Sequence, residues 1–172
     1  AVGKDSLALN TTASNNTAVG YQSLLDNTTG ANNIAVGNYA LSNNTTSNSN
    51  VAMGYAALET NTTGANNVAI GSTALLSNTT ASNNTAVGYQ ALYDNTTAER
   101  NTAVGRLAAA NTTTGADNTA MGSAALTTNT TGANNIAIGA SALRLNTTAS
   151  NNTAVGFEAG YANTGDKNTF VG

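Results

Sequence analysis

Few side chains in this sequence could carry chemistry. Its 172 residues include eight acids and five bases but no His and no Cys, so the commonest acid–base group, the commonest metal ligand and every thiolate are missing. Catalysis needs ionisable groups that converge, and the calcium-binding nonapeptide G-G-x-G-x-D is also absent. We therefore expect a non-catalytic chain with no metal and no cofactor. The acids occupy scattered polar positions: Asp5, Asp26, Glu59, Asp94, Glu99, Asp117, Glu158 and Asp166.

The low charge of the chain also limits its partners. Charged residues make up 8% of the sequence, and the net charge is −3. The bases Lys4, Arg100, Arg106, Arg144 and Lys167 are scattered, whereas nucleic acids and anionic membrane surfaces require clustered Lys and Arg. No apolar run is long enough to span a membrane. The sequence predicts no nucleic-acid partner and no membrane span in this segment.

Tracts of the form Asn-Thr-Thr offer two kinds of chemistry. Each tract matches the N-x-[ST] glycosylation sequon, and glycans on its Asn or Thr would form a column along one edge of the molecule. The same residues suit a structural ladder, in which stacked side-chain amides bond one another. Both interpretations stay open for eight asparagines: Asn10, Asn27, Asn44, Asn61, Asn78, Asn95, Asn129 and Asn146.

Recurring Thr and Tyr residues raise the alternative that the surface itself binds a ligand. Flat Thr arrays can bind ice, but Thr11 and Thr12 are adjacent and would point to opposite sides of a strand, unlike a T-x-T array. Tyr21, Tyr55 and Tyr89 recur at one position of alternate units, about 9.6 Å apart by strand spacing and too far for ring stacking. Packing at a corner and a carbohydrate-binding stripe both fit this spacing.

All of these residues are positioned by one repeat of 17 residues. We expect residues 1–172 to form a single tandem-repeat array, with units starting at residues 1, 18, 35, 52, 69, 86, 103, 120, 137 and 154. Both ends fall inside a unit, so we expect a fragment of a longer chain. The last unit is one residue shorter and has Gly160 where Leu is usual, as in a capping or variant unit. The register is set by ten glycines: Gly3, Gly20, Gly37, Gly54, Gly71, Gly88, Gly105, Gly122, Gly139 and Gly156.

The composition of one unit predicts its conformation. The consensus is A-[VIM]-G-x-x-[AS]-L-x-x-N-T-T-[GAS]-x-x-N-[TIV]. Apolar β-branched residues alternate, as at Ile34 and Val36, with the period of a strand, and the Asn-Thr-Thr tract has turn chemistry. We expect a short strand, a glycine corner, a second extended segment carrying Ala-Leu, and a polar turn. Such units stack into an all-β fold, a parallel β-solenoid or β-roll of about ten 17-residue coils.

Stacking of identical coils places equivalent side chains in columns. We expect two apolar columns in the core, where each buried member contributes about 1.5–3 kcal/mol, partly offset by the entropy of ordering a coil. The corner glycines would be structural residues, and the Asn columns would bond up the stack. The expected core columns are Val19, Val36, Ile70, Val87 and Ile138, and Leu24, Leu41, Leu58, Leu75 and Leu92.

Short motifs in every unit resemble a known repeat. The tracts NNIAIG at residues 134–139 and NNVAIG at 66–71 resemble the NSVAIG-type repeat of YadA-like trimeric adhesin heads. The longer tract NTAVGYQAL at residues 84–92 is similar to repeats of phage tail fibres and bacterial surface proteins. The resemblance implies a left-handed parallel β-roll in which three chains pack side by side. Ile34, Ala35 and Val36 would then lie on the inner strand of a shared core.

The unit of this chain is longer than that repeat, by its Asn-Thr-Thr turn. A single-chain solenoid and another filament symmetry therefore stay open beside the trimer. We expect the structural shaft of an extracellular fibre, filament or adhesin at a cell or virion surface. Its partner would be itself, as a parallel homo-oligomer or as an end-to-end filament joined through open sheet edges. The alternative is that the repeat surface binds a host glycan, a neighbouring filament or ice.

Overall fold

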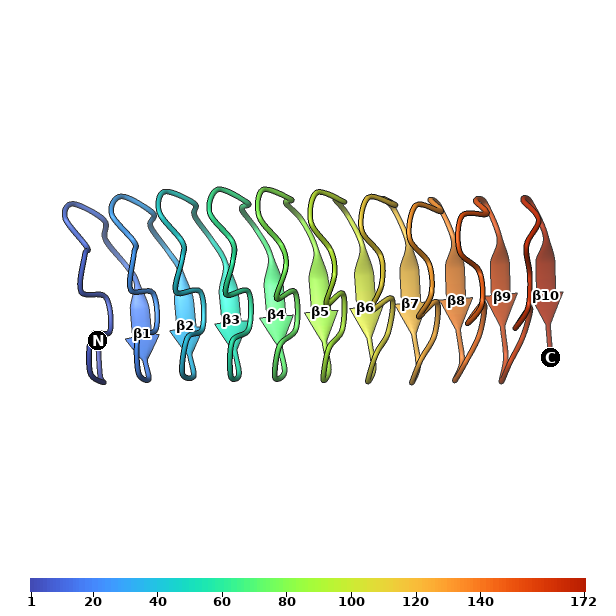
Figure 1. The fold of residues 1–172 in the computed structure, drawn as a ribbon, viewed down its shortest axis with the longest axis horizontal. Helices are drawn as coiled ribbons and strands as arrows, with labels where there is room; N and C mark the ends of the chain where they lie inside the picture. Colours follow the sequence, from blue (N-terminus) through green and yellow to red (C-terminus); the bar gives the residue numbers. More distant parts are fainter.

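The computed structural model describes residues 1–172 as a rod of stacked coils with no helix (Figure 1). Each strand pairs in parallel with the next strand along the chain, and the register joins equivalent residues, such as Ala69 with Ala86. The predicted all-β parallel solenoid with 17-residue coils is confirmed. Its single sheet contains ten strands: β1 (Thr17–Val19), β2 (Ile34–Val36), β3 (Val51–Met53), β4 (Val68–Ile70), β5 (Thr85–Val87), β6 (Thr102–Val104), β7 (Thr119–Met121), β8 (Ile136–Ile138), β9 (Thr153–Val155) and β10 (Thr169–Val171).

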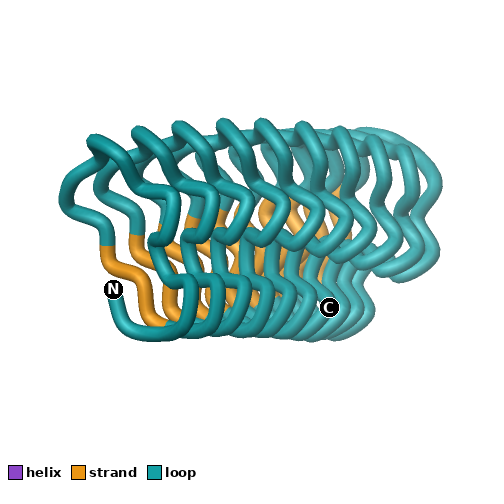
Figure 2. Tube along the Cα trace, turned by 60° about the vertical axis from the view of Figure 1, so that its left-hand side comes forward, coloured by secondary structure: helices purple, strands orange, loops and turns teal.

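The strands occupy one side of the rod, and turns form the rest of each coil (Figure 2). We name each coil after the strand that begins it, so that the β5 coil spans residues 85–101 and the β6 coil residues 102–118. Of 112 backbone hydrogen bonds, only 18 lie within the sheet. Most of the others join the turns of adjacent coils, so the stack is held on every side. No helix that could cross a membrane is present.

The segment after each glycine corner is not the second extended segment that we expected. In the β4 coil, Thr73 and Leu75 have left-handed backbone with φ of 54° and 52°. The N–H of Thr73 donates to the carbonyl of Tyr55 in the preceding coil. The N–H of Leu75 donates to the carbonyl of Ala91 in the following coil. Left-handed residues cost about 1 kcal/mol or more each. They let the chain turn sharply while it bonds to both neighbours and directs each Leu inward.

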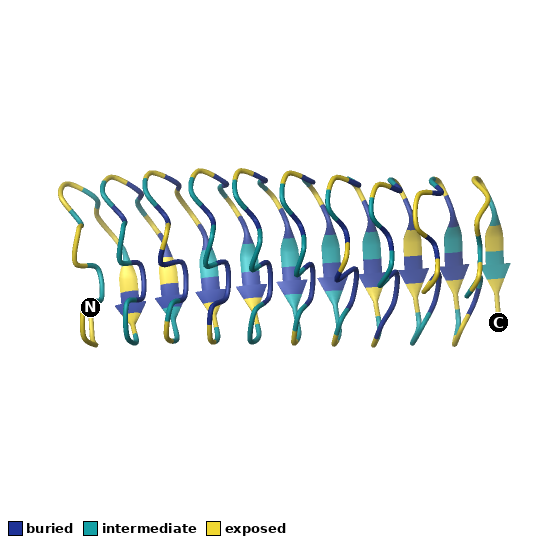
Figure 3. Ribbon diagram, viewed as in Figure 1, coloured by how far each residue is buried: buried dark blue, intermediate teal, exposed yellow.

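The core of the rod consists of alanine and leucine. The central residue of each strand from β1 to β9 is a fully buried alanine, as Figure 3 shows for the middle of each arrow. Alanines just before the Leu column are buried as well. Fully buried leucines follow the corners at Leu24, Leu41, Leu58, Leu75, Leu92, Leu126 and Leu143.

The expectation that the Val and Ile column lies in the core is wrong. Val19, Ile70 and Ile138 are 38–39% exposed, and Val36 and Val87 are half-buried. All five occupy the third position of a strand, next to the central alanine. Because successive strand residues point to opposite faces, an alanine that points inward directs its two neighbours outward.

The narrow interior of the coil explains why alanine takes the inner position. A coil of 17 residues encloses little space, and the Leu column fills much of it. The end of the rod shows the exchange: Phe170 replaces the strand alanine in β10, and Gly160 replaces the Leu of the β9 coil. A Cβ on Gly160 would lie 2.6 Å from the Phe170 ring. The side chain at the strand centre and the side chain in the Leu column therefore compete for the same space inside the coil.

Candidate functional site

The outer face of the sheet carries no charge along the whole rod and combines apolar side chains with threonines. The first and third residues of every strand point outward, and both columns contain only Thr, Val, Ile and Met. Among the larger residues of the two columns, Ile34 is 37% exposed and Met121 is 42% exposed. The first column is Thr17, Ile34, Val51, Val68, Thr85, Thr102, Thr119, Ile136, Thr153 and Thr169, and the third-position column is Val19, Val36, Met53, Ile70, Val87, Val104, Met121, Ile138, Val155 and Val171.

The sheet face, formed by those two columns, is as large as the largest apolar patch of a typical soluble monomer. Ten strands at strand spacing make it about 45 Å long and about 10 Å wide, or roughly 450 Å². The largest apolar patch of a monomer covers about 300–600 Å² and commonly marks an interaction site. A charge-free strip of this length is therefore the main candidate for function.

Tyrosine side chains line the corner that borders the sheet face. The Tyr21 and Tyr39 ring centroids are 5.3 Å apart, and those of Tyr39 and Tyr55 are 6.1 Å apart, both in edge-to-face geometry. The distance argument from the sequence missed Tyr39, which lies one residue later in its coil and fills the gap between the other two. Desolvation and the neighbouring phenols raise the pKa of Tyr39. Tyr55 and Tyr89 are half exposed or more.

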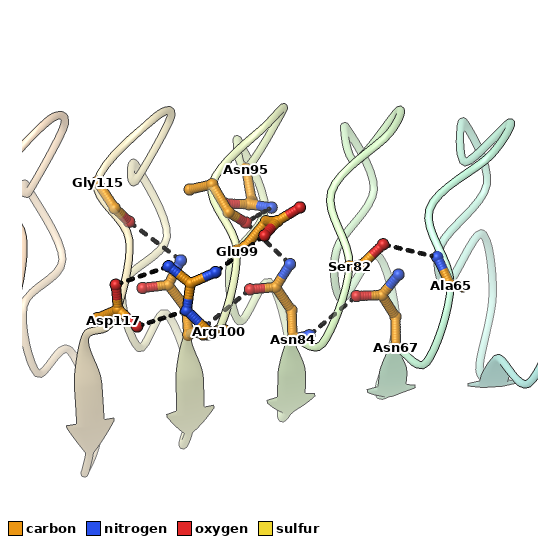
Figure 4. A network of polar contacts seen from close by, with 11 residues as sticks. Ala65, Asn67, Ser82, Asn84, Asn95, Glu99, Arg100, Gly115 and Asp117 are labelled. Atoms are coloured by element: carbon orange, nitrogen blue, oxygen red, sulfur yellow. Dashed lines mark hydrogen bonds and ion pairs between the residues drawn. The ribbon is translucent and has the colours of Figure 1, made fainter.

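An inner column of asparagines, from Asn16 to Asn168, holds the backbone of the stack together. Asn84 shows the pattern (Figure 4): its Oδ1 accepts the N–H of Asn101 at 2.9 Å, and its Nδ2 donates to the Ala98 carbonyl at 2.9 Å. The Oδ1-to-backbone bond recurs at every junction of the column. This ladder bonds mainly amide to backbone, where we expected amide to amide; Asn152 Nδ2 also donates to the amide oxygen of Asn135 at 3.2 Å.

The sequon asparagines form a second column that does bond amide to amide. Asn78 Nδ2 donates to Asn61 Oδ1 at 2.8 Å and to the Ala81 carbonyl at 3.1 Å, so both of its hydrogens are used. Seven of the eight sequon asparagines, all except Asn10, are fully buried. Glycans at those seven positions are incompatible with the folded stack, which corrects the glycosylation alternative there. Asn10 is half-buried and donates to the Ala13 carbonyl.

The two threonines of each tract have different surroundings. The first donates its hydroxyl to a carbonyl of the next coil, as from Thr62 to Thr79 at 3.1 Å. The second, such as Thr63 or Thr80, is exposed. Within the tract, only the second Thr column therefore presents free side chains, so the tract does not form a paired hydroxyl array of the kind that suits ice.

One group of charged residues comes together, although the sequence left the acids scattered. Arg100 bonds to Asp117 of the next coil through Nε at 2.7 Å and through a terminal nitrogen at 2.9 Å (Figure 4). Its other terminal nitrogen lies 2.9 Å from Glu99. The hydrogen bonds from Arg100 lower the pKa of Asp117. The group is largely exposed, and no cluster of metal-ligating side chains is present.

Comparisons with protein-family models, with curated proteins and with solved structures find no match. No pocket for a small molecule is present either. The function must therefore be argued from the exposed surfaces and from the ladders that support them.

Removal of one inner-ladder amide tests how much that column stabilises the rod. Asn84→Ala leaves the Asn101 N–H buried without a partner, and it removes one of the two bonds to the Ala98 carbonyl, which keeps the bond from Asn95 Nδ2. We expect the free energy of unfolding to fall by about 1–3 kcal/mol, the usual cost of one buried N–H left without an acceptor. Denaturant unfolding followed by circular dichroism measures the change. The exposed Thr80→Ala is the control, and a loss as small as the control's would contradict a stabilising ladder.

Proposed function

We propose that this chain is the non-catalytic structural shaft of an extracellular fibre or adhesin, projecting from a cell or virion. The observation that carries the proposal is the charge-free sheet face on a rod whose every coil is tied to the next. A shaft must resist bending and local unfolding. Backbone bonds on all sides and two asparagine columns supply that resistance, because no coil can move without breaking bonds to both neighbours.

The occupant of the sheet face, in this proposal, is a second copy of the same chain. A neighbouring copy in parallel orientation presents the same two columns of Thr, Val, Ile and Met at the same rise per coil. Coils at the same height therefore face one another, and no buried charge needs a partner. The absence of charge over twenty consecutive outward positions favours such self-packing over an ionic partner.

The corner tyrosines extend the contact that copies could make. The sheet face alone covers roughly 450 Å², whereas a stable interface buries about 800 Å² on each partner. Tyr55 and Tyr89 border that face with about half of their surface exposed. Aromatic residues are enriched in interfaces. The resemblance to trimeric adhesin heads favours three copies, with each chain contacting two others.

Substitution on the sheet face tests self-association without disturbing the core. We expect Ile70→Arg to shift the protein from oligomer to monomer in analytical ultracentrifugation, because buried guanidinium groups would face one another. Circular dichroism should stay unchanged, since Ile70 lies outside the coil interior. Thr80→Arg, on an exposed turn, should leave the mass unchanged. A wild-type protein that sediments as a monomer would remove the support for this assembly.

The register in which two copies pack can be tested by introducing a single cysteine, because the chain has none of its own. Val87→Cys places a thiol on the sheet face, and parallel in-register packing brings equivalent residues close together. Oxidation should then give a cross-linked dimer on a non-reducing gel. Thr80→Cys should not cross-link. Cross-linking of Thr80→Cys but not Val87→Cys would place the contact on another surface.

The alternative that the repeat surface binds a ligand is favoured only by the exposed tyrosine row. Tyr21, Tyr39 and Tyr55 offer aromatic faces next to polar corner residues. A glycan array and an adhesion assay on this chain separate the two functions, because a shaft predicts no saturable binding. Thermal hysteresis of the purified protein tests for ice binding in the same way.

A further inference from the structure

Two buried side-chain polar atoms lack a hydrogen-bond partner, and both lie at the junction of the β5 and β6 coils. They are Asn95 Oδ1 and Thr112 Oγ1. Both residues have no exposed surface. Buried polar atoms are nearly always bonded in folded proteins, so a pair of exceptions at one place requires a physical cause.

The cause is a single break in the sequon column. At an intact junction, Asn78 Oδ1 accepts a bond from Asn95 Nδ2 at 2.8 Å. The next member of the column is Thr112, which has no amide to donate, so Asn95 Oδ1 is left empty. In the coil after Thr112, Asn129 Nδ2 has no amide oxygen of a preceding asparagine to bond. It donates only to the Gly132 carbonyl, at 2.9 Å.

The apolar column is interrupted in the same coil. Ala109 stands in the Leu column between Leu92 and Leu126, and all three are buried. The side chain of alanine has three carbons fewer than that of leucine. Shortened core side chains cost both transfer energy and packing. The β6 coil thus weakens its polar and its apolar column together.

We propose that this junction binds one buried water molecule and is the weakest junction of the rod. The water donates one hydrogen to Asn95 Oδ1 and bonds to the Thr112 hydroxyl, which can both donate and accept. Two to four polar partners are what a buried water in a protein requires.

The surface ion pair spans the same junction but does not repair it. Arg100 of the β5 coil bonds to Asp117 of the β6 coil, with side chains 53% and 39% exposed. Exposed ion pairs contribute little to stability and are screened by salt. The buried break therefore decides the strength of the junction.

A weak junction has a defined consequence in a one-dimensional stack. Each coil contacts only its neighbours, so the rod opens where the coupling between two coils is lowest. Opening at the β5–β6 junction frees the N–H groups of Leu92, Asp94 and Thr96, which donate to carbonyls of the β6 coil. Those amides should exchange with solvent before the equivalent amides of the other inner coils.

Hydrogen exchange by mass spectrometry on the whole chain tests the weak junction. In the wild type, residues 92–97 should exchange about ten- to a hundredfold faster than residues 75–80, the equivalent stretch of the intact β4 coil. Thr112→Asn restores the column and should slow exchange at 92–97 by a similar factor. Asn78→Thr introduces the same break in the column between Asn61 and residue 78. It should make residues 58–63 a second stretch of fast exchange. Equal wild-type exchange at the two stretches, or no response to Thr112→Asn, would overturn the proposal.

A high-resolution crystal structure tests the water itself. Density for one water within hydrogen-bonding distance of Asn95 Oδ1 and Thr112 Oγ1 is the expected result, and it should vanish in Thr112→Asn. A direct hydrogen bond from the Thr112 hydroxyl to Asn95 Oδ1, with no water between them, would overturn the assignment. Thr112→Asn adds a hydrogen bond and creates no cavity, so this variant is expected to fold.

Discussion

Gly88→Ala is expected to lower the free energy of unfolding by at least about 3 kcal/mol. Gly88 has a φ of 134°, a backbone conformation that residues with a Cβ rarely adopt. An added Cβ would also lie 2.5 Å from the carbonyl oxygen of Gly105 and 2.7 Å from its carbonyl carbon, in the next coil. The corner cannot move away, because the N–H of Gly88 donates to the Ile70 carbonyl and the N–H of Gly105 donates to the Val87 carbonyl. Denaturant unfolding followed by far-UV circular dichroism measures the loss.

A loss of only about 1–2 kcal/mol in Gly88→Ala, which is the cost of left-handed strain alone, would mean that the close approach of the coils plays no part.

The 17-residue period could be predicted from sequence because geometry at the corner admits one residue type. A positive φ and a neighbouring coil within van der Waals distance exclude every side chain, so Gly3 and its equivalents recur without exception up to Gly156. Parallel pairing of each coil with the next then follows from identity of the units. Fold class and register could therefore be predicted from the residues alone.

Which face of the strand points inward could not be predicted from sequence. Val36 is more hydrophobic than Ala35, and general burial preferences place the larger residue in the core. The structure reverses this order, because the space opposite the strand already holds a Leu such as Leu41. The inner diameter of the coil depends on the left-handed turn that follows the corner. No local sequence pattern predicts that turn, since residues as different as Gln, Tyr, Ala and Leu occupy its left-handed positions.

The candidate site was missed for the same reason. Residues assigned to the core, such as Ile70 and Ile138, form the exposed sheet face. The break at Thr112 was visible as a departure from the Asn column, yet its meaning required the bond that Asn95 Oδ1 lacks. Sequence periodicity identifies equivalent positions; it does not say which of them face one another across the coil.

The shared volume inside the coil predicts a strong coupling between the strand alanine and the Leu column. Leu75→Gly alone should cost about 3–5 kcal/mol by leaving a cavity. Ala86→Phe alone should cost about 3 kcal/mol by overpacking the fully buried centre of β5. The double variant copies the arrangement of Gly160 in the β9 coil and Phe170 in β10, where the ring occupies the space of the missing Leu.

We therefore expect Leu75→Gly/Ala86→Phe to lose about 3 kcal/mol less than the sum of the single losses. The matched cycle pairs Ala86→Phe with Leu24→Gly, which lies several coils away, and its two losses should add within about 0.5 kcal/mol. Denaturant unfolding of the six proteins supplies both coupling energies. Additive losses in the first cycle would mean that the Phe170 ring does not replace the Leu side chain. The narrowness of the coil could then not explain why alanine occupies the strand centre and why Val and Ile face outward.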